Sequence, residues 1–289
     1  MTFNRLLVMA GMGLIFTGCA VSSVDQSAND SAGAAPLGAG GRPAAVSWSR
    51  SPVYGRNGMA ATAHPLASQV AIDILKQGGS ALDGAIAANA ALGLMEPTGN
   101  GIGGDVFFII WDPKTQQLYG YNGSGRAPLD RSLIDLKSQI ASLRQSGAMP
   151  EDMSGIPQRG SLPVTVPGTV DGWFAAHARF GKLPMSDVLA PTIRYAREGF
   201  PITPVIAYYF ERNLSAFREQ EALIEELDNA AALWFPKGKT PKSGEVFRNP
   251  DLANTLEILG EEGRAAFYQG RLATVMDTYF KRIGADMRF

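Results

Sequence analysis

The chain has 289 residues, 45% of them hydrophobic, and its 26 basic residues nearly balance 27 acidic ones. This length and hydrophobic content are sufficient for a sizeable core in one large domain or two small ones. The balanced charge, with no basic stripe interleaved with aromatic residues, argues against a nucleic-acid partner. Two histidines and one cysteine are too few for an ordinary zinc site, so we expect no metal and no cofactor.

Residues 1–19 resemble an export signal. Arg5 precedes an apolar segment, 6–16, which is too short to span a bilayer and is typical of a signal-peptide core. The segment runs into the sequence FTGC, which resembles a bacterial lipobox whose cysteine is acylated, although Phe16 departs from the usual aliphatic residue. We therefore expect export to the periplasm, lipidation of Cys19, and membrane contact only through this anchor.

Residues 20–52 are rich in Ser, Ala, Gly, Asp and Pro, a composition that buries too little apolar surface to fold. We expect a disordered tether that reaches about 30 Å. The folded region is then expected over residues 53–289.

The folded region opens with small residues at 58–63, which predict a short strand. His64 then starts a helix, because proline at position 65 is accepted in a first turn. Apolar residues recur on this helix at the spacing of a single buried stripe. They are Ala67, Val70, Ala71, Ile74 and Leu75.

A second helix is predicted after a glycine pair at 78–79. Ser80 and Asp83 resemble a capping box, with Asp in place of the usual Glu or Gln, and the helical pattern ends near Met95. Both helices are short, and we expect them to form one outer layer facing a sheet.

A predicted β-hairpin follows, with glycine-rich stretches at 96–105 and 122–128. Its strands are the apolar run 106–111 and the segment 117–121, joined by a turn at 112–115. Glycine-rich backbone of this kind suits sharp turns, close packing or the close approach of a ligand.

Gly99, Gly101 and Gly104 fit the dinucleotide-binding pattern G-x-G-x-x-G. That pattern binds a pyrophosphate only when a strand precedes it and a helix follows. Here a helix precedes the glycines and a strand follows them, so a nucleotide-binding protein is the weakest of the alternatives.

A strand is predicted at 164–166, before a turn at Pro167-Gly168. Helical patterns are predicted over 132–145, 170–180, 186–199, 205–217, 251–260 and 265–283. Helices that alternate with sheet in blocks favour a layered α/β or α+β body.

Several of these segments, in this order, resemble the start of the γ-glutamyltransferase family. They are 58–61, 73–85, 96–104, 166–170, 199–204, and 249–253 followed by 266–270. The resemblance covers residues 58–289 and concerns only the large, N-terminal subunit of the family.

This resemblance implies the α+β fold of N-terminal-nucleophile hydrolases, a four-layer αββα sandwich made as a self-cleaving proenzyme. Cleavage frees a threonine whose α-amino group serves as its base. The threonine attacks a γ-glutamyl amide, as in glutathione metabolism, and passes the acyl group to water or an amino acid. Because this threonine begins the small subunit, only the large-subunit part of the sandwich is expected here.

The chain stops before the cleavage point of the family, which implies a truncated large subunit that is inactive without its small-subunit partner. Thr62 precedes Ala63 and His64 and superficially resembles the cleavage junction. It lies in the opening strand of the family, so we expect a structural threonine.

The substrate-binding residues also depart from the family pattern. Family members place an arginine before the Ala-Pro that ends the second hairpin strand, and its planar guanidinium holds the substrate carboxylate. Ser124 occupies that position here, and Arg126 lies two residues further on, on the same face if the strand continues. We take both as candidate substrate-binding residues; a loop-anchoring role for Arg126 is an equal alternative. This Gly-Ser-Gly-Arg-Ala-Pro version resembles a divergent branch of the family. That resemblance makes γ-glutamyl amides a less secure expectation and adds other amides, such as oxamate or the acyl side chains of β-lactams, as candidate substrates.

Four further polar residues have simpler interpretations. Asp105 is either a turn cap or a pocket carboxylate, and Asp83 is a capping or core-network carboxylate. His64 is a helix-entry residue, and His177 is a packing residue on a helix.

Two functions stay open: an exported amidohydrolase or acyltransferase seen through its large subunit, and a noncatalytic lipoprotein or binding module that retains the fold. Half a sandwich should expose a broad apolar face.

Overall fold

The computed structural model describes residues 53–129, 131–285, 287 and 288, which belong to the unit Arg50–Phe289. The predicted signal peptide, Cys19 and the tether lie outside the described residues. Within the described part of the chain, no helix is long and apolar enough to cross a membrane.

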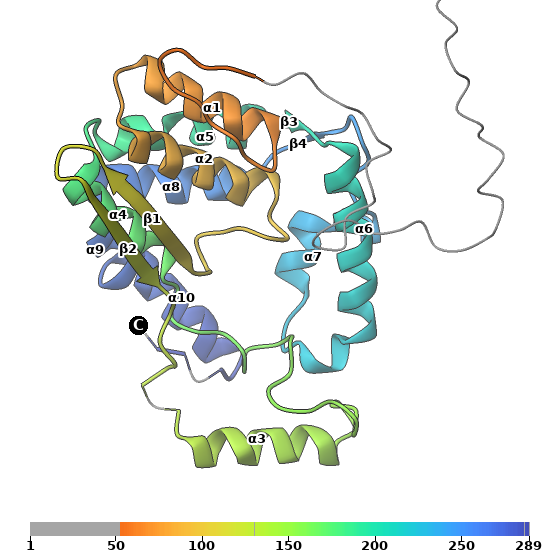
Figure 1. Ribbon diagram of the computed structural model, residues 1–289. Helices are drawn as coiled ribbons and strands as arrows, with labels where there is room; N and C mark the ends of the chain where they lie inside the picture. Colours follow the sequence, from red (N-terminus) through yellow and green to blue (C-terminus); the bar gives the residue numbers. More distant parts are fainter. Residues whose placement is uncertain (1–52, 130, 286, 289) are drawn as a thin grey trace, which may run out of the picture. The chain divides into compact units, whose positions relative to one another are not determined.

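Helices dominate the described part of the chain, and the hairpin of β1 and β2 lies at one side of them, next to α4 (Figure 1). In chain order the elements are α1 (Pro65–Lys76), α2 (Ala81–Met95), β1 (Val106–Asp112), β2 (Gln117–Gly123), α3 (Leu133–Gln145), α4 (Thr169–Phe180), α5 (Met185–Glu198), β3 (Phe200–Pro201), α6 (Pro204–Glu219), η3 (Glu221–Leu223), α7 (Asp228–Trp234), η4 (Pro236–Gly238), β4 (Val246–Phe247), α8 (Pro250–Glu262), α9 (Arg264–Tyr268) and α10 (Arg271–Arg282).

The start of α1 follows the predicted helix-entry chemistry. His64 has extended backbone, and its Nδ1 accepts the backbone N–H of Leu66 at 3.2 Å, which satisfies one free donor of the first turn. Pro65 fills the first helical position. The predicted apolar stripe is buried except for Leu75, which is half-buried.

The capping box that starts α2 is confirmed. The Ser80 hydroxyl accepts the Asp83 N–H at 3.1 Å, and the Asp83 carboxylate accepts the Ser80 N–H at 2.7 Å. The expected place of α2 in an outer layer is wrong, because α2 contacts α1, α4 and α5 and is buried on most sides. Its run of alanine and glycine lets these three helices approach together.

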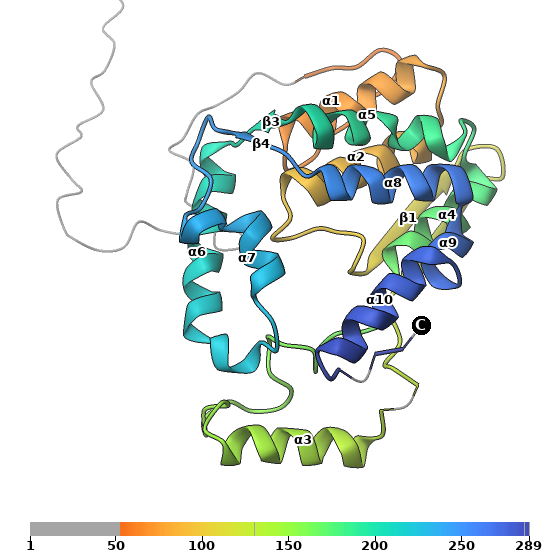
Figure 2. The same ribbon diagram turned by 180° about the vertical axis from the view of Figure 1, so that it is seen from behind.

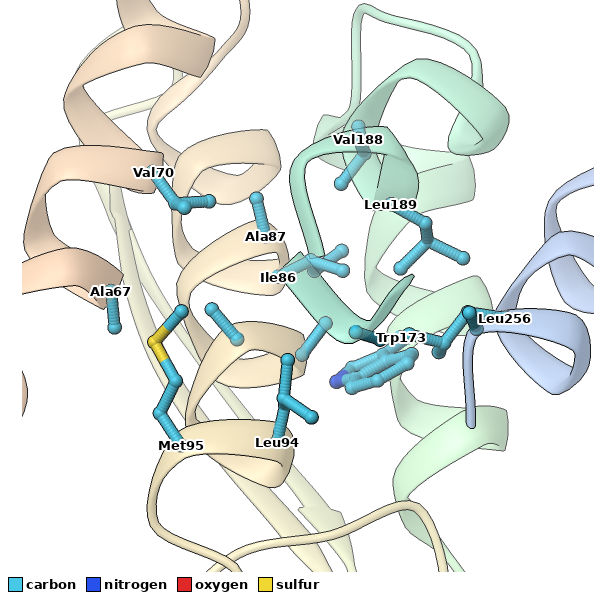
Figure 3. Close-up of a cluster of buried hydrophobic side chains, with 14 of the residues drawn as sticks. Ala67, Val70, Ile86, Ala87, Leu94, Met95, Trp173, Val188, Leu189 and Leu256 are labelled. Carbon is cyan, nitrogen blue, oxygen red and sulfur yellow. The ribbon is translucent and has the colours of Figure 1, made fainter. Parts of the chain in front are cut away.

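The core lies around α2. Figure 3 shows side chains from α1, α2, α4, α5 and α8 in one cluster, including Val70, Ile86, Trp173, Leu189 and Leu256. Figure 2 shows α8 alongside α5, its main packing partner. These helices form one packed core, and α4 connects that core to the hairpin.

The predicted hairpin is confirmed, with antiparallel pairing from Val106 opposite Gly123 to Asp112 opposite Gln117. One face packs on α4 (Figure 1). The opposite face is apolar and is not covered by the described residues. It consists of Phe107 at 64% exposure, Ile109 at 82%, Trp111 at 54% and Leu118 at 65%, which we call the apolar hairpin face. An exposed face of this kind is what half a sandwich was expected to present.

Two predicted strands are wrong, because neither 58–63 nor 164–166 pairs as a strand. Among the described residues, the one backbone bond from the second segment to the region after the hairpin joins Val166 N to Arg126 O at 2.9 Å. A strand is stable only beside a partner strand, and among the described residues these segments have none.

The long helix expected over 265–283 is also wrong, because it divides into α9 and α10 at Gly270. A Cβ at Gly270 would lie 2.9 Å from the Cα of Ala266, so this tight bend requires glycine. Helix α7 and the short pair β3–β4 had no clear sequence signal. The mixed helix-and-sheet class is confirmed, with both sheets two-stranded within the described residues, so the four-layer sandwich is present only in part.

Candidate functional site

Three glycine-containing segments meet where α4 begins. The carbonyl oxygen of Gly104 accepts hydrogen bonds from Gly168 N at 2.9 Å, Thr169 N at 3.0 Å and the Thr169 hydroxyl at 2.9 Å. The Thr169 hydroxyl also lies 3.3 Å from Gly101 O. Thr169 is buried, so these bonds tie the loop before β1 firmly to the first turn of α4.

Glycine is required where these segments touch. A Cβ on Gly168 would lie 1.9 Å from Gly123 O, and a Cβ on Gly125 would lie 2.0 Å from Val166 O. Backbone therefore packs directly on backbone at the end of β2. Close packing was one of the three interpretations of the glycine-rich stretches made from the sequence.

The glycines of the dinucleotide-like pattern have different surroundings. A Cβ on Gly99 or Gly101 would meet nothing within 4 Å, so these positions border open space. They lie in a loop that leads from α2 into β1. This order is the reverse of a dinucleotide-binding cradle, as the sequence indicated.

Ser124 and Arg126 follow directly after β2, and both are exposed. Asp105 holds this segment, because its Oδ1 accepts Gly125 N at 2.9 Å and its Oδ2 lies 3.5 Å from the Ser124 hydroxyl. Asp105 therefore bridges the two glycine-rich stretches, a role beyond either interpretation made from the sequence. Among the described residues, no acceptor binds the Arg126 guanidinium. The structure thus brings Asp105 to the Ser124–Gly125 backbone, with Arg126 the next residue along, while their roles toward a substrate stay predictions.

A second carboxylate network, centred on Asp171, lies next to this site, and sequence analysis missed it. Asp171 accepts the Tyr121 hydroxyl at 2.9 Å and pairs with Arg264. The Tyr268 hydroxyl accepts Asp171 N at 2.9 Å and donates to Pro167 O at 2.7 Å. The network joins β2, α4 and α9 to the turn that contains Gly168. No local pattern could have revealed it, since its members are far apart in sequence.

The electrostatics of this network follow from its contacts. Burial raises the pKa of Tyr268 to about 12. Burial also raises the pKa of Tyr121, and the hydrogen bond to Asp171 adds to that effect. For Asp171, burial alone would raise the pKa, but hydrogen bonds from Arg264 and Tyr121 outweigh it and hold the pKa below its ordinary value. Near neutral pH, Asp171 is therefore an anion between neutral tyrosines and a cationic guanidinium.

The two other singled-out residues on helices have structural roles. Asp83 is fully buried and accepts Lys182 N at 3.0 Å and Leu183 N at 3.2 Å, in addition to its capping bond. His177 Nε2 lies 2.8 Å from Leu183 O, and since a carbonyl only accepts, Nε2 carries the proton. The same nitrogen is 3.6 Å from Asp83, so both residues lock the loop after α4 onto α2.

Thr62 is also engaged structurally. Its hydroxyl donates to His64 O at 2.7 Å and lies 2.9 Å from the Ser68 hydroxyl. These bonds fix the entry into α1, in agreement with the structural role expected for this threonine.

Comparison with solved structures supports the fold class. The crystal structure of cephalosporin acylase from Bacillus halodurans has a TM-score of 0.75 and 37% identity to this chain, covering 85% of it and 43% of the acylase chain. The predicted N-terminal-nucleophile hydrolase architecture is thereby confirmed for the part present here.

The γ-glutamyltranspeptidase family pattern matches residues 67–288, and the chain belongs to this family. The glutathione hydrolase-like YwrD proenzyme of Bacillus subtilis is 34% identical over 236 residues, which cover 81% of this chain and 41% of that protein. The oxamate amidohydrolase proenzyme of Klebsiella pneumoniae is 36% identical over 224 residues, covering 75% and 38%. The chain therefore spans about two fifths of the length of these enzymes. The predicted family is confirmed; the assignment to a divergent branch stays a prediction.

Proposed function

We propose that this chain is the large-subunit part of an amidohydrolase or acyltransferase that hydrolyses or transfers the acyl group of a γ-glutamyl or related amide. The observation that carries this proposal is the juxtaposition of Ser124 and Arg126 with an uncovered apolar hairpin face. Both residues follow the end of β2 and are exposed, and the described residues leave the apolar hairpin face uncovered. Relatives are proenzymes named for glutathione hydrolysis and oxamate amide hydrolysis, which supports the amide class.

In this proposal Arg126 binds the carboxylate of the acyl donor. A guanidinium offers paired N–H donors in the plane of a carboxylate. Arg126 is exposed two residues beyond Ser124, although β2 already ends at Gly123, so its reach toward a substrate rests on this exposure and not on a continued strand. Ser124 adds one neutral hydroxyl, and Asp105 keeps both residues on a fixed backbone through its bond to Gly125.

The chemical step needs a threonine at a free amino terminus, which a small subunit would supply. Its hydroxyl adds to the amide carbonyl while its α-amino group accepts the proton. The amine then leaves with that proton, and water or an amino acid takes the acyl group from the threonine. This chain contributes the substrate grip and the scaffold, so we expect the 289-residue chain to be inactive alone.

The apolar hairpin face is the surface on which we place the small subunit. Its four large side chains are more than half exposed. Burying each of them would contribute roughly 1.5–3 kcal/mol, a strong driving force for association between sheets.

An activity assay tests the proposal. The 289-residue chain and the polypeptide obtained by continuing its reading frame past Phe289 are each assayed with γ-glutamyl-p-nitroanilide and with oxamate. We expect turnover only from the longer polypeptide, after self-cleavage before a threonine. A longer polypeptide that neither cleaves itself nor turns over either amide would favour the noncatalytic binding module.

We further propose that the chain is exported to the periplasm and anchored through a lipid on Cys19. The support is the short apolar segment that ends at a lipobox-like FTGC. In a bacterial host, metabolic labelling with an alkyne fatty acid should mark the chain, and Cys19→Ser should lose both the label and the membrane fraction. Equal labelling of both proteins would exclude this anchor.

A further inference from the structure

Two hydrogen bonds hold the backbone on either side of the Arg126 Cα atom. On one side Gly125 N donates to the Asp105 carboxylate at 2.9 Å. On the other side Arg126 O accepts Val166 N at 2.9 Å. The Arg126 side chain is exposed, so these two bonds fix the point from which it extends. Any group that holds Val166 in place therefore also affects Arg126.

The turn after Val166 contains a peptide group that is held at both ends. Pro167 O and Gly168 N belong to this one planar peptide. Pro167 O accepts the Tyr268 hydroxyl at 2.7 Å, and Gly168 N donates to Gly104 O at 2.9 Å. Because a peptide plane turns as one body, the Tyr268 hydroxyl helps to fix the plane with which α4 begins.

The Tyr268 hydroxyl has a defined orientation. It accepts Asp171 N at 2.9 Å, and because a backbone N–H only donates, the hydroxyl proton points to Pro167 O. Burial raises the pKa of Tyr268 to about 12, so this proton stays on the oxygen at neutral pH. The phenol is therefore a steady donor to the turn.

The turn and the segment that carries Arg126 are in direct backbone contact. A Cβ on Gly125 would lie 2.0 Å from Val166 O, and a Cβ on Gly168 would lie 1.9 Å from Gly123 O. Closely packed groups transmit a displacement to one another. A shift of the turn must therefore shift the segment with Arg126.

We propose that Tyr268 is a positioning residue of the substrate site, which sets the place of the Arg126 guanidinium by holding the Pro167 carbonyl. Among the described residues, the hydroxyl bonds Pro167 and Asp171, so its influence on Arg126 passes through the turn at 166–168. Small displacements of a binding group weaken substrate binding strongly. The effect on a substrate rests on the function proposed above, whereas the effect on the turn does not.

Amide hydrogen exchange of the 289-residue chain, followed by NMR, tests the effect on the turn. Tyr268→Phe removes the hydroxyl and keeps the ring, which contacts Phe267 and the Arg264 guanidinium. Relative to the amides of the β1–β2 ladder, Val166 N and Gly168 N should exchange about tenfold faster in the variant than in the native chain. This factor corresponds to the net value of one hydrogen bond.

Tyr119→Phe is the matched control. It also removes a hydrogen-bonded hydroxyl, which lies 2.9 Å from Gln117 Oε1 and 3.2 Å from the Thr115 hydroxyl, at the turn end of the hairpin. Exchange at Val166 N and Gly168 N should stay at the native rate in this variant.

The effect on a substrate is measured in the longer self-cleaved polypeptide. Tyr268→Phe should raise KM for γ-glutamyl-p-nitroanilide about threefold, with a smaller effect on kcat. When Arg126→Ala is already present, Tyr268→Phe should raise KM less than about 1.5-fold, because its route to the substrate is gone. A purely structural role would instead lower the active fraction, and so kcat, equally in both backgrounds.

Two results would overturn the proposal. One is exchange at Val166 N and Gly168 N that rises no more than exchange in the β1–β2 ladder. The other is a rise in KM on Tyr268→Phe that is equal with and without Arg126. An unchanged KM in Arg126→Ala alone would overturn the function proposed for Arg126 and with it the effect on KM, and the exchange rates would still decide whether Tyr268 holds the turn.

Discussion

Gly168 and Gly125 are the residues on which the candidate site depends most directly. Each is a position where the backbone of one segment rests on the carbonyl oxygen of another, leaving no room for a side chain. Neighbouring glycines such as Gly101 border open space, so equal-looking residues in one glycine-rich sequence have different reasons to be glycine. The distinction gives a direct test.

Gly168→Ala should destabilise the folded chain by about 2–4 kcal/mol, because the new Cβ would overlap Gly123 O and force the end of β2 away from the start of α4. Urea unfolding followed by circular dichroism measures the change. Gly101→Ala is the control, and with nothing near its Cβ it should change stability by less than about 1 kcal/mol. Similar losses for both variants would contradict the proposed backbone contact.

His64 makes stability depend on pH. Burial lowers its pKa from 6.5, so the imidazole is neutral in the folded chain. In the unfolded chain it binds a proton below about 6.5, so acidification favours unfolding. The contribution of His64 is therefore complete above pH 6.5 and is lost as the pH falls through the lowered pKa.

Urea midpoints at pH 7.5 and 5.5 should show this loss in the native chain. His64→Asn keeps a capping oxygen for Leu66 N and should show a smaller decrease between the two pH values. An equal decrease in the variant would assign the pH dependence to other groups.

At the scale of elements, the hairpin has two faces with opposite roles. Val106 and Gly123 pack inward near α4, while the apolar hairpin face is uncovered. The inward face supports the present fold, and the outward face is the surface proposed above for the small subunit. Substitutions on the two faces should therefore separate stability from association.

Ile109→Lys should change the stability of the 289-residue chain by less than about 0.5 kcal/mol, since Ile109 is 82% exposed. The same change should lower the binding of a hydrophobic dye and block association with a small subunit, because a lysine cannot be buried there without a partner. Dye fluorescence and co-purification measure these effects. A large loss of stability would show that the face is already covered.

The Asp171 network adds polar bonds between β2, α4 and α9, which also pack on one another. The Tyr268 hydroxyl accepts the backbone N–H of Asp171 in the first turn of α4 and donates to the carbonyl oxygen of Pro167. Tyr268→Phe would leave Asp171 N and Pro167 O without that partner and should cost about 1–3 kcal/mol. Tyr208→Phe, a change on α6 away from this network, should cost less than about 0.5 kcal/mol, and urea unfolding compares the two. Equal losses of unfolding free energy in the two variants would show that the network does not stabilise the fold.

At the scale of the whole molecule, the chain builds the helical support and one hairpin of a larger architecture. The similar acylase chain extends well beyond the part matched here. The proposed activity is thus a property of the completed enzyme, and Arg126 is best tested there.

In the completed enzyme, Arg126→Ala should raise KM for a carboxylate-bearing donor at least about tenfold with a smaller effect on kcat, since the proposed contact binds ground state and transition state alike. Arg126→Lys should fall between, because an ammonium cannot form the paired bonds. Oxamate and γ-glutamyl-p-nitroanilide are both suitable substrates. An unchanged KM would leave Arg126 as a surface residue.

Much of this molecule was determined by short-range sequence features. The α1 stripe, the Ser80–Asp83 capping box and the hairpin depend on residues within a few positions of one another, and their spacing alone predicted them. The ordered family segments likewise identified the relatives. These features could be predicted from the sequence because hydrogen bonding and amphipathic packing within one element act over a single turn or a single strand pair.

Only the tertiary structure decided the rest. It placed α2 at the centre, left 58–63 and 164–166 without strand partners, and joined Tyr121 to Asp171 across 50 positions and Tyr268 to Pro167 across 101. It also brought Val166 N to Arg126 O. Such contacts depend on the path of the whole chain, because burial and long-range hydrogen bonds are set by which elements meet, and local spacing carries no information about that meeting.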